Sequence, residues 1–181
     1  FLLDNVTQSA VKTELLLVVK EETARNIRIV VQDLVAEVAS FSDERGTGWA
    51  ELTPFLFQAI QEGSTTVVES ALKIIAEMAR YSMIPPLDAI HPVLEAHLGH
   101  NEPGVRMAAA EASCQVICQS AGTDQARVVR ERFQNTMEAM LKVMQFALNN
   151  GSEDHAQELL EMLIEVADEE PRFFRKSLTE T

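Results

Sequence analysis

The chain has 181 residues, of which 46% are apolar and only 6% aromatic, with 7 Gly and 6 Pro. Sheets need many turns and many aromatic or β-branched residues, whereas the Ala, Leu, Glu, Val and Gln that dominate here favour helices. The formal net charge of −13 disfavours binding to nucleic acid or to anionic membranes, because proteins that bind these surfaces need an excess of Lys and Arg. Composition predicts an all-α protein. A basic protein partner would suit its charge, although acidity is also a route to solubility.

Helical periodicity runs almost from end to end and is interrupted only by short polar breaks. No apolar run approaches the roughly 20 residues of a membrane span. The stretch 126–149 is expected to be one long helix that stops at Asn150-Gly151. In chain order the pattern predicts helices over residues 8–20, 23–40, 49–62, 66–80, 85–99, 104–120, 126–149 and 152–167, and a ninth beginning at Pro171.

The beginnings of three predicted helices repeat one pattern, of the type V-R-x-x-A-x-x-x-L, at residues 27–28, 67–68 and 105–106. Their spacings of 40 and 38 residues agree with the ~40–47 residues of HEAT repeats, and a fourth copy follows nearer 50 residues on. A helix pair of this kind cannot bury its apolar face alone, so neighbouring pairs must stack. We therefore predict an α-solenoid of antiparallel HEAT helix pairs, with armadillo or another helical repeat as the alternative. The units are placed near residues 24–62, 64–99, 103–149 and 152–181, after an orphan helix at 8–20.

Two predicted helices have apolar faces that bear on packing. In the helix 23–40 the residues expected to point inward are Ile27, Val30, Val31, Leu34 and Val38. The first helix carries a wholly apolar run at residues 15–19 that has lost the partner expected to cover it, and the chain opens on Phe1 rather than Met. We expect an excised segment whose exposed apolar end drives self-association.

The residues that could carry chemistry do not form a recognisable site. Cys114 and Cys118, four apart on a helix, share a face without readily meeting disulfide geometry, which favours reduced thiols. Together with His97 and His100 they could be a split metal site, but neither pair has the spacing and turn of a zinc finger. Phosphate-binding glycine loops and nucleophile motifs are absent from the sequence. We expect no metal, no cofactor and no catalytic residue.

Acidic side chains are the most uneven feature of the sequence. The stretch from Gly151 to Glu170 contains eight carboxylates and no Lys or Arg. A solvent-facing stripe is the simpler interpretation of this pattern, and a docking surface for a basic partner is the alternative. The stripe on the predicted helix consists of Glu158, Glu161, Glu165 and Asp168.

A second polar set lies opposite the apolar stripes on the other helix of each pair. Solenoid proteins hold partners on their concave side, and these residues are expected to face it. The set is Glu51, Gln58, Glu62, Asp88 and Glu95.

Three segments, in this order, resemble a known family: SAVKTELL at 9–16, WAELxxFL at 49–56 after a polar loop, and LIEVADEEPRFFR at 163–175. They are similar to the N-terminal part of the importin-beta (karyopherin-beta) receptors, in the importin-beta-3 or importin-five class. The correspondence covers essentially the whole chain. Single motifs are weak because HEAT helices resemble one another, so the order and loop placement carry the resemblance.

The resemblance implies a nuclear transport receptor that moves between cytoplasm and nucleus through the nuclear pore. Such receptors bind Ran in its GTP state, phenylalanine-glycine nucleoporins and cargo, with most cargo contacts in later repeats. In this family the inner helices of the early repeats hold Ran. The resemblance therefore assigns a Ran-binding role to Glu51, Gln58, Glu62, Asp88 and Glu95. The alternative function is a HEAT scaffold subunit that positions enzymes and has no transport role, although such scaffolds tend to have more uniform repeats.

Overall fold

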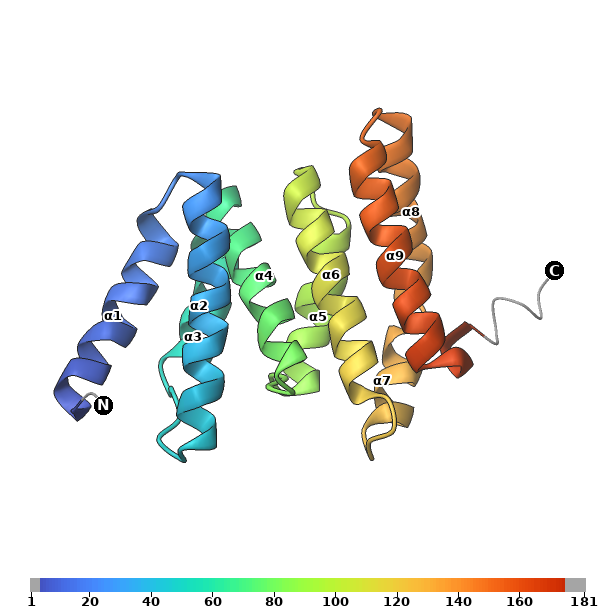
Figure 1. The fold of residues 1–181 in the computed structure, drawn as a ribbon. Helices are drawn as coiled ribbons and strands as arrows, with labels where there is room; N and C mark the ends of the chain where they lie inside the picture. The colour runs from blue at the N-terminus through green and yellow to red at the C-terminus, as the bar shows by residue number, and fades with distance from the viewer. Residues whose placement is uncertain (1–3, 175–181) are drawn as a thin grey trace. The chain divides into compact units, whose positions relative to one another are not determined.

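The computed structural model describes residues 4–174, and all regular structure within them is helical (Figure 1). The prediction of an all-α chain is confirmed. Residues 175–181, which include the end of the last predicted unit and of the motif at 163–175, lie outside the described residues. The elements are α1 (Asn5–Glu21), α2 (Arg25–Glu44), α3 (Leu52–Glu62), α4 (Thr65–Arg80), α5 (Leu87–Leu98), α6 (Pro103–Ser120), α7 (Ala126–Phe133), α8 (Thr136–Asn149), α9 (Glu153–Glu169) and the 3₁₀ helix η1 (Pro171–Phe174).

Successive helix pairs repeat along the chain. Helices α2, α4, α6 and α9 begin at residues 25, 65, 103 and 153, so their starts lie 40, 38 and 50 residues apart. These are the spacings predicted from the sequence, and the fold is a HEAT-type α-solenoid. Because α2 contacts α1 as well as α4, and α6 contacts α5 as well as α9, these contacts do not divide the helices into separate pairs, and the boundaries of the repeats at 24–62, 64–99, 103–149 and 152–181 stay a prediction. None of the helices in residues 4–174 has the length and apolar character that a membrane span requires.

The first of two compact units, Phe1–Met83, contains α1 to α4. In it α1 packs antiparallel to α2 and α3 antiparallel to α4, while α2 lies along α4 (Figure 1). A buried hydrogen bond crosses that last contact, from Gln32 Nε2 to Ser70 Oγ at 3.0 Å. Fully buried side chains fill the space between the helices; they include Val35, Ala39, Leu52, Leu56, Leu72 and Ile75.

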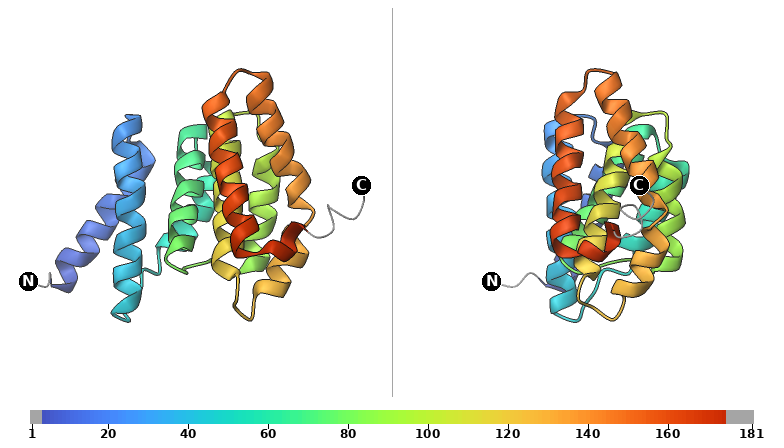
Figure 2. Two further views of the ribbon diagram at one scale, coloured as in Figure 1. Left: turned by 45° about the vertical axis from the view of Figure 1, so that its right-hand side comes forward. Right: turned by 90° about the vertical axis from the view of Figure 1, so that its right-hand side faces the viewer.

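The second unit, Ile84–Thr181, is organised around α6. This helix contacts α5, α7, α8 and α9, and it is buried on nearly every side. Its neighbours approach closely because it presents small residues, of which Ala108, Ala109, Ala110 and Ala112 are wholly inaccessible. Figure 2 shows α8 and α9 lying side by side in this unit. A helix that is buried all round has no amphipathic stripe, which explains why its sequence mixes small apolar and small polar residues.

The predicted long helix at 126–149 is wrong, because the chain bends between Phe133 and Thr136 to form α7 and α8. The two intervening residues, Gln134 and Asn135, keep right-handed helical dihedral angles. Buried residues therefore keep a helical spacing across the bend, and neither Pro nor Gly marks the position of the bend in the sequence. The cause is tertiary: α7 packs against α5 and α6, whereas α8 also packs along α9.

The predicted inward face of α2 is also partly wrong. Val31 is buried, but Ile27, Val30 and Leu34 are 44%, 63% and 40% exposed. Val35, Ala36 and Ala39 take their place in the core. The apolar residues span more than one side of this helix, so periodicity alone could not select the side that meets α1 and α4. Other helix starts also differ from prediction: α1 begins at Asn5 rather than residue 8, α3 begins at Leu52 rather than Trp49, and only a 3₁₀ turn follows Pro171.

Candidate protein-binding site

The predicted polar residues of the first unit lie on or just before α3, and all are exposed. Glu51 directly precedes the helix, Gln58 lies in its second half and Glu62 is its last residue. Gln58 Nε2 donates a hydrogen bond to Glu62 Oε2 at 2.9 Å, so these two side chains act as one polar group. Glu51 instead lines a separate hollow. The structure thus divides the predicted set of this unit into two sites.

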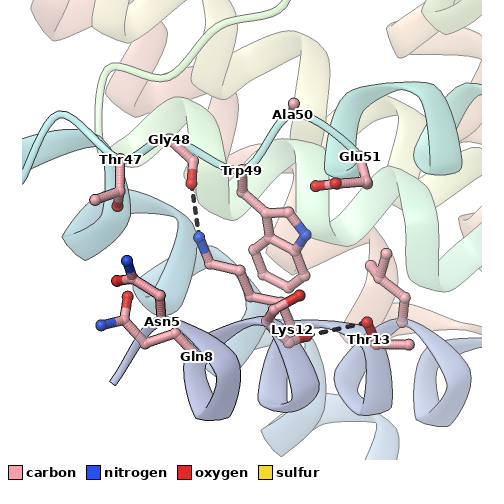
Figure 3. A pocket seen from close by; sticks show the side chains of 11 residues that line it. Asn5, Gln8, Lys12, Thr13, Thr47, Gly48, Trp49, Ala50 and Glu51 are labelled. Carbon is pink, nitrogen blue, oxygen red and sulfur yellow. Dashed lines mark hydrogen bonds between the residues drawn. The ribbon is translucent and has the colours of Figure 1, made fainter. Parts of the chain in front are cut away.

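The N-terminal hollow, as we call it, has a volume of about 610 Å³ and lies between α1 and the loop that leads to α3 (Figure 3). Asn5, Gln8 and Lys12 line it from α1, and Trp49 and Glu51 line it from the loop. Lys12 Nζ donates a hydrogen bond to the Gly48 carbonyl at 2.6 Å and lies 5.6 Å from the centre of the Trp49 ring. One lysine therefore both ties the loop to α1 and contacts the indole.

Two glycines shape the loop that carries this site. Gly46 and Gly48 have φ of 68° and 59°, in the left-handed region that side chains disfavour. The Thr47 and Gly48 amides both donate to the Ser42 carbonyl at 3.0 Å, which folds the loop back on the end of α2. The Gly48 carbonyl is thereby presented to Lys12. Trp49 was singled out by the sequence, but its lysine partner, 37 residues earlier in the chain, was not.

A second hollow, of about 360 Å³, lies beside Gln58 and Glu62. Its apolar lining comes from Phe55, Ala59 and Val67, and Lys20 of α1 also borders it. An apolar lining with a few polar groups is typical of ligand-binding pockets.

In the second unit the predicted residues Asp88 and Glu95 lie on α5, and both are exposed. Asp88 forms an ion pair with Arg132 of α7, so part of its charge is already neutralised within the chain. Glu95 is the more available carboxylate of the two. The predicted surface is therefore less uniformly acidic here than the sequence suggested.

The acidic stripe of α9 lies on the surface, as the simpler interpretation requires. Glu158, Glu161, Glu165 and Asp168 are all exposed, and Glu161 accepts a hydrogen bond from Gln157 at 2.9 Å. Glu170, at the end of the same acidic stretch, behaves differently. It is buried, and its Oε1 lies 3.0 Å from Nη1 of Arg130 on α7.

A protein-family model described as "IPO5-like, TPR repeats" matches residues 23–181 of this chain. The chain belongs to this importin-beta family. The match covers most of the sequence and agrees with the resemblance carried by the segments at 49–56 and 163–175. Members of the family are helical-repeat transport scaffolds rather than enzymes.

Solved structures of the karyopherin Kap121p share the fold of this importin-family chain. They include Kap121p itself, its complex with the SUMO protease Ulp1p and its complex with Nup53p, with TM-scores of 0.79, 0.78 and 0.77. Each is 18% identical in sequence and matches 98% of this chain. The chain spans about 17% of the length of Kap121p.

The candidate metal ligands of this importin-family segment, two cysteines and two histidines, are buried or in contact with neighbouring groups of the chain. Burial raises the pKa of the Cys114 thiol far above its usual range and that of Cys118 to about 12, with smaller contributions from Cys118 and Glu165 respectively. A reactive or metal-binding cysteine needs a thiolate, which burial of this kind disfavours. His97 donates from Nδ1 to the Val93 carbonyl at 2.7 Å and stacks on His100. Among residues 4–174, His, Cys, Asp and Glu form no group of three that could hold a metal.

Proposed function

We propose that this chain is a segment of a nuclear transport receptor that binds Ran in its GTP state, nucleoporins and cargo during protein import. The observation that carries the proposal is the family match over residues 23–181. Kap121p, whose fold is similar, has been solved bound to Nup53p and bound to Ulp1p, which supports partners of these kinds. The receptor would work in the cytoplasm, in the nucleus and at the nuclear pore.

The proposed contacts for Ran are the exposed polar residues of α3 and α5. Charge is the physical reason, since carboxylates at an interface steer a basic partner and fix its register. The proposed contacts of the first unit are Glu51, Gln58 and Glu62, and those of the second unit are Glu95 and the partly neutralised Asp88. The acidic stripe of α9, Glu158, Glu161, Glu165 and Asp168, is proposed as a further docking surface for a basic protein.

Binding of Ran tests the proposal in the intact parent protein, which supplies the repeats absent from this chain. We expect capture of Ran-GTP and no capture of Ran-GDP. Replacing Glu51, Glu62 and Glu95 together by Lys should weaken capture, because three carboxylates become three cations facing a basic surface. In the matched control, three exposed acidic residues of α2 that lie outside the proposed surface are replaced by Lys: Asp33, Glu37 and Glu44. This control should leave capture largely unchanged. Equal binding of both nucleotide forms would instead favour the scaffold function.

We also propose that the chain self-associates through its N-terminal helices. Leu15 and Val19 of α1 are buried, but Leu17 is 43% exposed, and Ile27 and Val30 of α2 are exposed as well. Apolar surface of this extent on two adjacent helices is a typical contact for another protein surface. Light scattering at increasing concentration should reveal dimers or larger species, and replacing Leu17, Ile27 and Val30 by Ser should abolish them. A strict monomer at high concentration would refute the proposal.

A further inference from the structure

The N-terminal hollow contains an aromatic ring that is already oriented before any partner arrives. Trp49 is half-buried, and the Lys12 ammonium lies 5.6 Å from the centre of its ring. That ammonium is itself held by the Gly48 carbonyl at 2.6 Å (Figure 3). Because the loop is tied to α1 at this point, the indole loses little freedom on binding, which lowers the entropic cost of using it as a contact.

Glu51 supplies a carboxylate to the same hollow. Its side chain lies on the far side of Trp49 from Asn5 and Gln8 (Figure 3). Within residues 4–174 its carboxylate makes no hydrogen bond and no ion pair, and the residue is exposed. Asp4, which precedes the lining residue Asn5, accepts a hydrogen bond from the Thr7 amide at 2.8 Å, and hydrogen bonds from Thr7 lower the pKa of its carboxyl. With a net charge of −13, the chain attracts cations to such a site.

We propose that the N-terminal hollow binds an arginine side chain of a partner protein, with the guanidinium against the Trp49 indole and paired with Glu51. A guanidinium is planar and weakly hydrated, so it stacks on an aromatic face and bonds a carboxylate with two parallel N–H groups. Lysine fits less well, because its compact ammonium is strongly hydrated. This inference rests on the proposed function, since Glu51 belongs to the proposed Ran contact, and it names the chemistry recognised there.

The rival occupant is an acidic side chain bound by Lys12. Two observations weigh against it. The Lys12 ammonium already donates to the Gly48 carbonyl and lies close to the indole ring. The charge of the whole chain also repels an acidic ligand. The two occupants predict opposite effects of removing the Lys12 charge, which makes them separable by experiment.

Trp49 is the single tryptophan of the chain, so its fluorescence reports this hollow directly. The 181-residue chain is titrated with an octapeptide of alternating glycine and arginine, and with matched lysine and glutamate peptides. We expect a saturable change in emission with the arginine peptide, weaker binding of the lysine peptide and no binding of the glutamate peptide. Raising the salt concentration should weaken binding of the arginine peptide, because its contact is partly electrostatic.

Variants locate the contact within the hollow. Glu51→Gln should raise the dissociation constant of the arginine peptide by about threefold to tenfold, as expected for a partly exposed ion pair combined with an aromatic contact. The matched control Glu37→Gln removes an exposed carboxylate from α2, outside the proposed binding surface, and should leave binding unchanged. Lys12→Met removes the charge that an acidic side chain would need, so arginine binding should persist, weakened at most by loss of the Gly48 hydrogen bond that ties the loop. Circular dichroism verifies that each variant is folded.

Three outcomes would overturn the inference: equal effects of Glu51→Gln and Glu37→Gln, absence of arginine binding, or glutamate binding that is lost in Lys12→Met. Capture of Ran-GTP by the parent protein is measured in parallel. If capture persists while the arginine peptide fails to bind, only the arginine site is refuted. If the peptide binds at Glu51 but capture of Ran-GTP fails, the arginine site stands and the transport function is refuted.

Discussion

Arg130 Nη1 lies 3.0 Å from Glu170 Oε1, which joins α7 to the C-cap of α9 across 40 residues of sequence. Both side chains are largely buried. The acidic stretch at 151–170 contains no Lys or Arg, so its last carboxylate becomes an internal group only because the end of α9 lies beside Arg130 of α7. This pair makes Glu170 part of the core of the second unit, while Glu158, Glu161 and Glu165 remain at the surface.

Removing Arg130 should destabilise the second unit. Arg130→Ala leaves Glu170 buried without its partner, and we expect the free energy of unfolding to fall by about 2–3 kcal/mol. Urea unfolding followed by circular dichroism measures the change. Arg127→Ala, which removes an arginine from an exposed pair with Glu131 on the same helix, is the control and should have little effect. Similar losses in both variants would contradict an internal role for Glu170.

The buried hydrogen bond between Gln32 and Ser70 should stabilise the contact of α2 with α4. Gln32→Ala and Ser70→Ala each leave one polar group unpaired, and each should cost about 1–2 kcal/mol. In the double variant the two losses should not add, with a coupling of about 1 kcal/mol, because a single interaction is removed. Fully additive losses would show that the two side chains do not interact.

Enlarging a small residue of α6 should disrupt the packing of the second unit. Ala109 is wholly inaccessible on a helix that contacts four others. Ala109→Leu should lower the free energy of unfolding by about 2 kcal/mol or more, because the added carbons have no space. Ala96→Leu, at an exposed position on α5, is the control and should be tolerated. Thermal unfolding of both variants distinguishes overpacking from a general effect of leucine.

Replacing Ser82 by glycine should stabilise the fold. The Ser82 φ of 61° lies in the left-handed region, where the residue ends α4 with hydrogen bonds from Ser82 N to Ala79 O and from Met83 N to Met78 O. Glycine adopts this conformation without strain, so Ser82→Gly should raise the free energy of unfolding by about 0.5–1 kcal/mol. Ser82→Ala retains the strain and should not stabilise. Chemical denaturation of the pair provides the comparison.

The buried thiols should make stability fall at alkaline pH. Folding raises the pKa of Cys118 to about 12 and that of Cys114 further, whereas an unfolded thiol titrates near ~8.5. Above that value the folded state holds more protons than the unfolded state, so the free energy of unfolding decreases as pH rises toward 12. The double variant Cys114→Ala/Cys118→Ala should lose less stability between pH 8 and 11, since other titrating groups are common to both proteins. Parallel slopes would contradict the prediction.

Local periodicity was sufficient to predict most of the helices and their repeat. The spacings of 40, 38 and about 50 residues appear in the sequence because each helix pair carries its own apolar stripe and its own breaks, and both are local properties. The exposure of Glu51, Glu62 and the α9 stripe was predicted for the same reason, since a carboxylate opposite an apolar face remains in water.

Contacts between distant residues were decided by the tertiary structure alone. The bend between α7 and α8 leaves helical dihedral angles unchanged, and the inward face of α2 depends on where α1 and α4 lie. Arg130 meets Glu170, and Lys12 meets the Gly48 carbonyl, only when helices far apart in sequence pack together. By itself the sequence determined which segments are helical and how often they recur. Packing decided which side each helix buries, because the amphipathic stripe of a helix leaves a choice that only its neighbours resolve.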